Sequence, residues 1–195
     1  MGYDTILGVL LGGGLSTRMG KDKRNIVLGG KTMLARSMAL LSNVLPQSVL
    51  VTHEPFACSY VCLQDCSERV GPIGGIYTAL EYAAKQGFKA ILTMPCDLPL
   101  MEQRFLQALC GEYERWPGLG IAWQSERGFV QNLLAVYRVE GRGYFARSIS
   151  LGDYRVQGVL PTDAVKYLTY TASEEKYFFN VNTKEDLQTV CAQLN

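Results

Sequence analysis

Short runs of consecutive hydrophobic residues alternate along the chain with longer segments in which hydrophobic residues recur at helical spacing. Runs of this kind are typical of strands that are buried on both faces of a parallel sheet. The longer segments are typical of helices with one buried face. In the first part of the chain this pattern predicts strands at residues 6–11, 48–52 and 89–94, and helices at 32–45, 74–86 and 102–113.

The second part of the chain has a weaker pattern. It predicts strands at 120–124, 129–138 and 165–171, a helix at 141–150, a short extended segment at 177–181 and a final helix at 183–194. Asn182 or Thr183 is expected to cap the final helix, with Glu185 and Asp186 in the favourable first turn. The alternation of strands and helices predicts a single-domain α/β protein, Rossmann-like and three-layered, with a mainly parallel sheet and right-handed crossovers.

Length and charge narrow the function classes. A chain of 195 residues is the size of one domain. Lys and Arg number 19 against 18 Asp and Glu, which leaves a formal charge of +1 and no general attraction for nucleic acid. Hydrophobic runs are too short for a membrane span, and the N-terminus lacks the basic start of a signal peptide. We therefore expect a cytoplasmic protein whose ligands include neither nucleic acid nor membrane.

The six cysteines do not form a recognisable metal motif. Cys58, Cys62 and Cys66 recur at every fourth position, but this spacing matches neither paired zinc ligands nor common iron–sulfur runs. His53 is the only histidine in the sequence, so a further ligand is scarce. The simplest interpretation is free thiols that act as small packing residues, with a metal site as the alternative.

The clearest candidate for chemistry is the glycine-rich loop after the first predicted strand. Eight of the 20 glycines lie within the first thirty residues, and Gly12, Gly13 and Gly14 follow Leu11 directly. Backbone N–H groups without Cβ atoms nearby approach phosphates closely, at the edge of the sheet where α/β proteins bind ligands. The loop also carries three cations, and together these features favour a polyphosphate over the alternative of a turn with surface charges; the cations are Arg18, Lys21 and Lys23.

Two common phosphate motifs do not fit this loop. The P-loop pattern requires four residues between its glycines and Ser or Thr after its lysine, whereas five residues separate Gly14 from Gly20 and Asp22 follows Lys21. The dinucleotide fingerprint also fails, because Thr17 stands where its last glycine is required. A P-loop kinase or GTPase is therefore disfavoured.

The loop instead resembles the L-x-G-G-x-S-x-R-M-G-x-D-K signature of the MobA-like nucleotidyltransferases over residues 11–23. Gly12 stands where that family usually has alanine, and Arg24-Asn25 replaces a usually apolar pair. Further matches follow in order to the end of the chain: Asp65 before GPIGGI at 71–76, PCDLP at 95–99, QNL at 131–133 and NVNTKEDL at 180–187. The second predicted strand ends in Thr52-His53, where the family often has a nucleotide-contacting Asn.

The resemblance implies a fold of the nucleotide-diphospho-sugar transferase type. It also implies transfer of GMP from GTP to molybdenum-bound molybdopterin, with Mg²⁺ as cofactor and pyrophosphate as the second product. Residues 1–115 would bind the nucleotide and residues 116–195 the acceptor, and maturation proteins of the molybdenum cofactor are possible partners. Alternatives are a related transferase that uses CTP or a sugar or alcohol phosphate, and a non-catalytic GTP-binding adaptor. Gly13-Gly14 resembles the guanylyl branch.

Roles follow for the matching residues. Asp97, at the carboxyl end of the third strand, is a natural Mg²⁺ ligand, with a turn residue as the alternative. Lys23 is the expected phosphate lysine, and Arg18 is expected on pyrophosphate or on the acceptor phosphate. Leu11, Gly12, Gly13, Gly14 and Asp65 are assigned to the nucleotide. Gly71, Gly75, Asn180 and Asn182 are assigned to the acceptor, with helix entry and helix capping as the alternatives.

Overall fold

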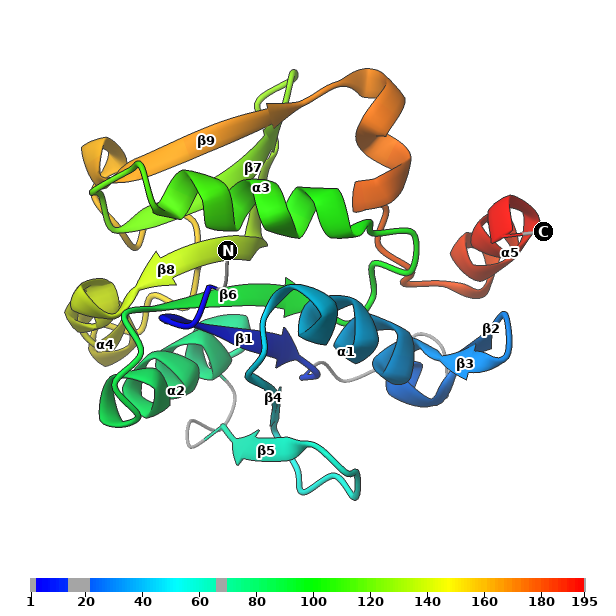
Figure 1. Cartoon of the computed structure of the whole chain (residues 1–195), viewed down its shortest axis with the longest axis horizontal. Helices are drawn as coiled ribbons and strands as arrows, with labels where there is room; N and C mark the ends of the chain where they lie inside the picture. Colours follow the sequence, from blue (N-terminus) through cyan, green and yellow to red (C-terminus); the bar gives the residue numbers. More distant parts are fainter. Residues whose placement is uncertain (1–2, 14–21, 66–69, 195) are drawn as a thin grey trace.

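The computed structural model describes residues 3–13, 22–65 and 70–194. Its centre is a seven-stranded sheet with the strand order β5-β4-β1-β6-β8-β7-β9 (Figure 1). In chain order these strands are β1 (Ile6–Leu11), β4 (Ser48–Thr52), β5 (Val61–Gln64), β6 (Ala90–Pro95), β7 (Gly120–Ser125), β8 (Val130–Arg138) and β9 (Val165–Tyr170). Because adjacent strands β5, β4, β1 and β6 are mutually parallel, their carboxyl ends meet at one edge.

The far half of the sheet departs from the parallel pattern at one strand. β8 runs antiparallel to both β6 and β7, whereas β9 is again parallel to β7. The β7–β8 connection covers only residues 126–129, which is long enough for a hairpin but too short for a parallel crossover. The predicted α/β class with a mainly parallel sheet is confirmed.

Helices cover both faces of the sheet and make the predicted three layers (Figure 1). α1 (Met33–Val44) and α3 (Gln103–Tyr113) pack together on one face. α2 (Pro72–Lys85) and α4 (Arg142–Ser150) pack together on the other. Both faces of the sheet are hydrophobic, as β1 illustrates, because its side chains alternate between two cores. Ile6 and Leu10 lie in the core on the α1/α3 side, and Leu7 and Val9 lie in the core on the α2/α4 side.

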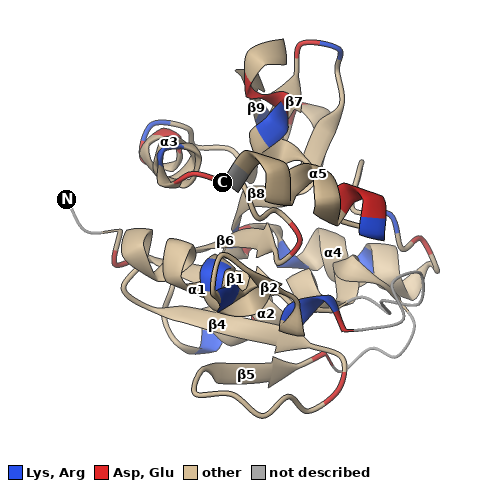
Figure 2. Ribbon diagram, turned by 90° about the vertical axis from the view of Figure 1, so that its right-hand side faces the viewer, with Lys and Arg blue, Asp and Glu red and all other residues tan. Residues whose placement is uncertain are grey.

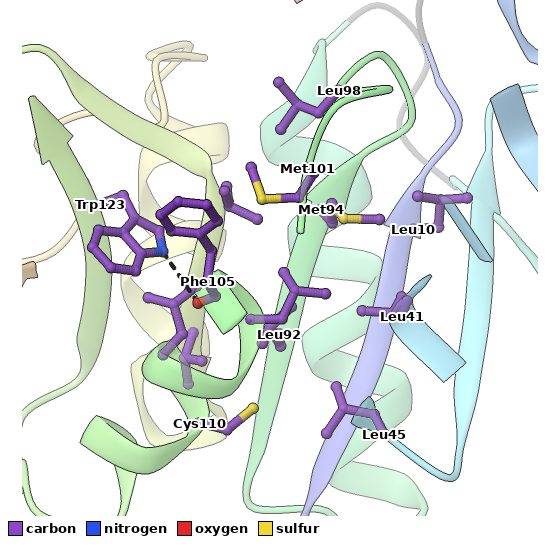
Figure 3. Packing of buried hydrophobic residues seen from close by; sticks show 14 of the residues in the cluster. Leu10, Leu41, Leu45, Leu92, Met94, Leu98, Met101, Phe105, Cys110 and Trp123 are labelled. Atoms are coloured by element: carbon purple, nitrogen blue, oxygen red, sulfur yellow. Dashed lines mark hydrogen bonds between the residues drawn. The ribbon is translucent and has the colours of Figure 1, made fainter. Parts of the chain in front are cut away.

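The α1/α3 core contains large interlocking side chains (Figure 3). Leu10 and Leu92 of the sheet lie beneath Leu41 of α1, and Phe105 of α3 packs edge-to-face on Trp123 of β7. The indole N–H of Trp123 donates to the backbone carbonyl of Phe105 (3.3 Å), so this buried polar atom is satisfied. This packing fixes α3 and the β6–α3 connection, which carries Asp97.

Smaller elements complete the described chain. They are the 3-10 helices η1 (Lys23–Asn25), η2 (Val139–Gly141), η3 (Thr162–Ala164) and η4 (Ala172–Phe178), the hairpin β2 (Val27–Leu28) and β3 (Lys31–Thr32), and the final helix α5 (Lys184–Leu194). α5 packs through Val190 against Leu28 of β2 and Met33 of α1, so the final helix lies beside the β2–β3 hairpin. None of the helices in the described ranges is long and apolar enough to cross a membrane.

The structure differs from the local predictions at two elements and adds one strand that was not predicted. Residues 177–181 are not extended throughout, because η4 continues to Phe178, whose ring is buried against Tyr170. α2 begins at Pro72, two residues before its predicted start, because proline is suited to the first helical position. β5 was not predicted, because its four residues have the mainly exposed pattern of an edge strand.

Candidate active site

Hydrogen bonds continue past the strand ends and place four loops side by side at the carboxyl edge of the sheet. The N–H of Gly12 donates to the carbonyl of Val51 (2.9 Å), and the N–H of Cys96 donates to the carbonyl of Leu11 (3.3 Å). On the other side, the N–H of Asp65 donates to the carbonyl of Thr52 (2.8 Å). Gly12, the start of the glycine loop, therefore lies between the loop that follows β4 and the loop that carries Asp97, and the loop that carries Asp65 lies one strand further out.

Three predicted site residues from distant parts of the chain meet at this edge, and we call them the Lys23 cluster: Lys23, Asp97 and Asn182. The Lys23 ammonium donates to Asn182 Oδ1 (2.6 Å) and lies 3.4 Å from Asp97 Oδ2. Side chains of Lys23 and Asp97 are 18% and 20% exposed, so both charges remain accessible to a ligand. Figure 2 looks onto this end of the molecule, where charged segments surround β6 and the start of α5.

Local interactions around η1 set the position of Lys23. The Asp22 side chain caps η1 by accepting from the N–H of Arg24 (3.0 Å), and it pairs with the Arg24 guanidinium (2.7 Å). Hydrogen bonds from Arg24 hold the pKa of Asp22 below its usual value. The guanidinium also lies over the Phe56 ring, 4.3 Å from its centroid. Asp22 therefore both orients the Arg24 cation and begins the turn of η1.

Asn182 reaches the cluster because the C-terminal segment is tied to the β6–α3 connection. The N–H of Val181 donates to the carbonyl of Asp97 (2.9 Å). Two residues later, Thr183 caps α5: its hydroxyl accepts from the N–H of Asp186, whose carboxylate accepts from the N–H of Thr183 (2.8 Å) and of Asn182 (2.8 Å). The cap is thus Thr183, and the Asn182 side chain is left to contact Lys23.

Asp97 has an incompletely satisfied carboxylate. Burial raises the pKa of this carboxyl, and the adjacent Lys23 charge opposes that rise. Oδ1 is buried and has no hydrogen-bond partner within the described part of the chain. A buried oxygen of this kind fits an Mg²⁺ ligand, since Mg²⁺ takes one or two carboxylates together with phosphate oxygens. The described residues contain no cluster of three or more His, Cys, Asp or Glu side chains that would enclose a metal by themselves.

A second group forms around Asp65, whose side chain is only 8% exposed. We call it the Asp65 group: Asp65, Gly74, Thr78 and His53. A Cβ on Gly74 would lie 2.8 Å from Asp65 Oδ2, so the carboxylate rests directly on the first turn of α2. Thr78, one turn further on, donates to Asp65 Oδ1 (3.5 Å), and His53 Nδ1 lies 4.0 Å from Oδ2. A helix N-terminus favours a carboxylate at this position.

The remaining predicted residues lie around these two groups. Leu11 packs its side chain into the α2/α4 core, so only its backbone is available at the edge. A Cβ on Gly13 would have no neighbour within 4 Å among the described residues, whereas Gly75 lies against Leu11 and next to Asp65. Gly71 adopts φ 72°, a backbone conformation that suits glycine, at the entry to α2. Gly14 and Arg18 lie outside the described residues, as do Gly20 and Lys21.

Asn180 is half-buried, two residues before Asn182. The predicted acceptor residues therefore come from two places, the start of α2 and the segment before α5. Gln131, in the QNL segment of β8, donates its side-chain amide to the Tyr170 hydroxyl (3.1 Å).

Three contributors were not assigned roles from the sequence: His53, Thr78 and Arg24. His53 follows the last residue of β4, and its place at a strand end is the signal that identifies it as a site residue. Thr78 lies four residues after Gly74 on the same helix face, which becomes informative only once Asp65 is placed there. Arg24 was noted only as a departure from the family pattern, and its stacking on Phe56 depends on a loop that sequence alone does not position.

A separate groove of about 700 Å³ runs between α1, the β6–α3 connection and η4. It is lined by residues such as Arg36, Leu98 and Tyr177, and it includes none of the predicted site residues. We therefore place the candidate active site at the sheet edge, where the predicted residues converge.

Comparison with known proteins gives full-length similarities. The chain is 28% identical over 193 residues to a probable molybdenum cofactor guanylyltransferase of Pyrococcus furiosus, covering 94% of this chain and 95% of that protein. It is 30% identical over 196 residues to a molybdenum cofactor guanylyltransferase of Rhizobium leguminosarum bv. trifolii, covering 96% and 92%.

A solved structure agrees in fold. The molybdopterin-guanine dinucleotide biosynthesis protein A of Archaeoglobus fulgidus superposes with a TM-score of 0.78 at 22% identity, covering 96% of this chain and 99% of that one. The family model of the MobA-like NTP transferase domain matches residues 8–164, which include most of β1 and the residues of both site groups other than Asn182. The resemblance of the sequence motifs is therefore confirmed, and the chain belongs to the MobA-like NTP transferase family of nucleotidyltransferases.

Proposed function

We propose that the protein transfers GMP from GTP to the phosphate of molybdenum-bound molybdopterin, giving the guanine dinucleotide cofactor and pyrophosphate. The observation that carries the proposal is the Lys23 cluster, in which a lysine, a carboxylate and an amide from three distant segments meet beside the glycine loop. The names of the full-length relatives support the choice of substrates.

The reaction requires the protein mainly to position the two substrates and to stabilise the charge that develops on the phosphates. An oxygen of the acceptor phosphate forms a bond to the α-phosphorus of GTP, and the bond from that phosphorus to the oxygen bridging the β-phosphate breaks. Lys23 would stabilise the negative charge that grows on the phosphate oxygens. The backbone N–H group at Gly13 would approach the phosphates where a side chain would obstruct it, since the N–H of Gly12 is already donated to Val51.

The carboxylates of Asp97 and Asp65 have different proposed roles. Asp97 would hold Mg²⁺ through its buried Oδ1, which has no partner in the described ranges, and the ion would supply charge neutralisation at the phosphates. Asp65 would accept hydrogen bonds from the ribose or from the guanine N–H groups. Asn182 positions Lys23 and, together with Asn180, would face the pterin, whose edge pairs donors with acceptors in the same way as an amide.

The test is a pyrophosphate-release assay on the purified full chain with GTP, Mg²⁺ and molybdopterin. Release that needs all three supports the proposal. Release with CTP in place of GTP would contradict the base assignment, and release with a sugar or alcohol phosphate would contradict the acceptor. GTP binding without turnover for any acceptor would favour the adaptor alternative, in which the protein passes its ligand to a maturation partner.

A further inference from the structure

Two cysteines outside the active-site groups lie in near contact. Cys58 lies in the loop after β4 and Cys62 lies in β5, and their sulfur atoms are 3.2 Å apart. A disulfide bond is about 2 Å long, so an approach of roughly 1 Å would join them. Cys62 is exposed and Cys58 is half-buried, whereas Cys96 and Cys110 are enclosed in the core. The pair was expected to be packing residues, and the exposure of Cys62 corrects that interpretation.

The surroundings favour thiol chemistry over metal binding. Cys58 Sγ lies 3.8 Å from the carbonyl of Tyr60, and Cys62 Sγ lies 3.7 Å from the carbonyl of Phe56. No set of three or more metal-ligating side chains occurs among the described residues. Partial burial, followed by the hydrogen bond and charge of Cys58, raises the pKa of Cys62 to about 11, while the Arg24 charge opposes this rise.

We infer that Cys58 and Cys62 form a redox-active dithiol that reacts with low-molecular-weight disulfides and closes reversibly into an intramolecular disulfide. One protein thiolate attacks a sulfur of the small disulfide, which forms a mixed disulfide and expels one small thiolate. The second protein thiolate then attacks the protein sulfur of the mixed bond and expels the other. The protein dithiol is oxidised by two electrons, the small disulfide is reduced, and the two thiol protons pass to the two released thiols.

The site lies next to the segment that carries Lys23. Phe56 is two residues before Cys58, and its ring supports the Arg24 guanidinium at 4.3 Å. Because the sulfurs are already close, the disulfide would restrain this loop in its present position. We expect the oxidised protein to gain thermal stability of a few degrees in Tm, as a short closed loop does.

The experiment treats the folded full chain with glutathione disulfide, quenches with acid and alkylates the remaining thiols. Chymotrypsin cleavage after Phe56, Tyr60 and Leu63, together with trypsin cleavage after Arg69, separates the three neighbouring cysteines. We expect peptides 57–60 and 61–63 to be linked, with an intact mass lower by two hydrogen atoms. Dithiothreitol should restore both thiols and the original Tm.

Single variants provide the controls. Cys58→Ser and Cys62→Ser should each stop at the glutathione adduct, whereas Cys66→Ser and Cys191→Ser should still form the internal bond. Thermal melts of all four variants verify that they are folded. A bond that involves Cys66, a stable glutathione adduct on the wild-type pair, or oxidation that requires denaturant would each overturn the proposal.

Discussion

The two ends of the candidate site are built by different means. At the Lys23 cluster, charged and polar side chains from η1, the β6–α3 connection and the segment before α5 meet through an ion pair and a hydrogen bond. In the Asp65 group, one carboxylate fits against a helix turn because Gly74 has no side chain. The first end is therefore sensitive to charge, and the second is sensitive to volume.

The two ends also differ in how far their side chains are exposed to solvent and to a ligand. Lys23 and Asp97 keep about a fifth of their side-chain surface exposed, so a phosphate or an ion can exchange with their present partners. Asp65 is enclosed, so its position is determined before any ligand arrives. Substitutions that keep shape but change charge should harm the first end most, and substitutions that add a methyl group should harm the second.

Asp97→Asn should have the largest effect, because it keeps the shape of the side chain and removes its charge. We expect kcat for pyrophosphate release to fall by about a hundredfold or more, with little change in folding stability. Initial-rate assays across a range of Mg²⁺ concentrations measure this effect. The matched control is Asp163→Asn, at an exposed acid in η3, which should retain full activity. Equal turnover by both variants would remove Asp97 from the chemistry.

Lys23→Met should reduce kcat/KM for GTP by roughly ten- to a hundredfold, because it removes the cation that we propose stabilises the phosphates. It also leaves Asn182 Oδ1 without its 2.6 Å donor. Lys31→Met, at an exposed lysine of β3, is the control for loss of one positive charge. If the control loses as much activity as Lys23→Met, general attraction of the nucleotide explains the effect and a specific contact does not.

Gly74→Ala and Gly75→Ala test the end that depends on volume. At Gly74 the new Cβ would lie 2.5 Å from Val70 Cγ2 and 2.8 Å from the Asp65 carboxylate, whereas at Gly75 the nearest atom is 3.4 Å away. We expect Gly74→Ala to lose about 1–3 kcal/mol of unfolding free energy through overpacking and to raise KM for GTP. Gly75→Ala should be neutral or slightly stabilising, because alanine is the better helix former.

Urea denaturation and GTP kinetics on both variants make the comparison. A larger loss for Gly75→Ala than for Gly74→Ala would show that Asp65 does not depend on the close approach at Gly74.

The contrast between the Lys23 cluster and the Asp65 group also explains which features of the structure could be predicted from the sequence. The hydrophobic runs and the carboxyl-edge rule were enough to predict the sheet, its covering helices and the proximity of Lys23 and Asp97 to the glycine loop. β5 escaped prediction because a four-residue edge strand lacks a continuous hydrophobic run.

The finer contacts depend on tertiary structure that the sequence pattern does not contain. Asn182 could be assigned to the site but not to Lys23, because that contact depends on the Val181–Asp97 backbone hydrogen bond. Thr78 becomes identifiable only when β5 has brought Asp65 to the start of α2, whereas the position of His53 after a strand is visible in the sequence.

Among the substitutions expected to be harmful, Gly12→Ala should have the smallest effect, and it tests whether the glycine that replaces the family's usual alanine is required. The new Cβ would lie 2.7 Å from Cδ1 of Leu50, a buried terminal methyl group that can rotate aside, whereas the Asp65 carboxylate opposite Gly74 is held in place. We expect a loss of about 1 kcal/mol in unfolding free energy with kcat nearly unchanged. Leu50→Val removes the obstructing methyl, so adding it to Gly12→Ala should cost less than the two single changes summed, as a double-mutant cycle would measure. A large loss of kcat with unchanged stability would instead mean that the phosphates approach the backbone at Gly12 too closely for any side chain, and the first loop would then be limited by volume in the same way as the Asp65 group.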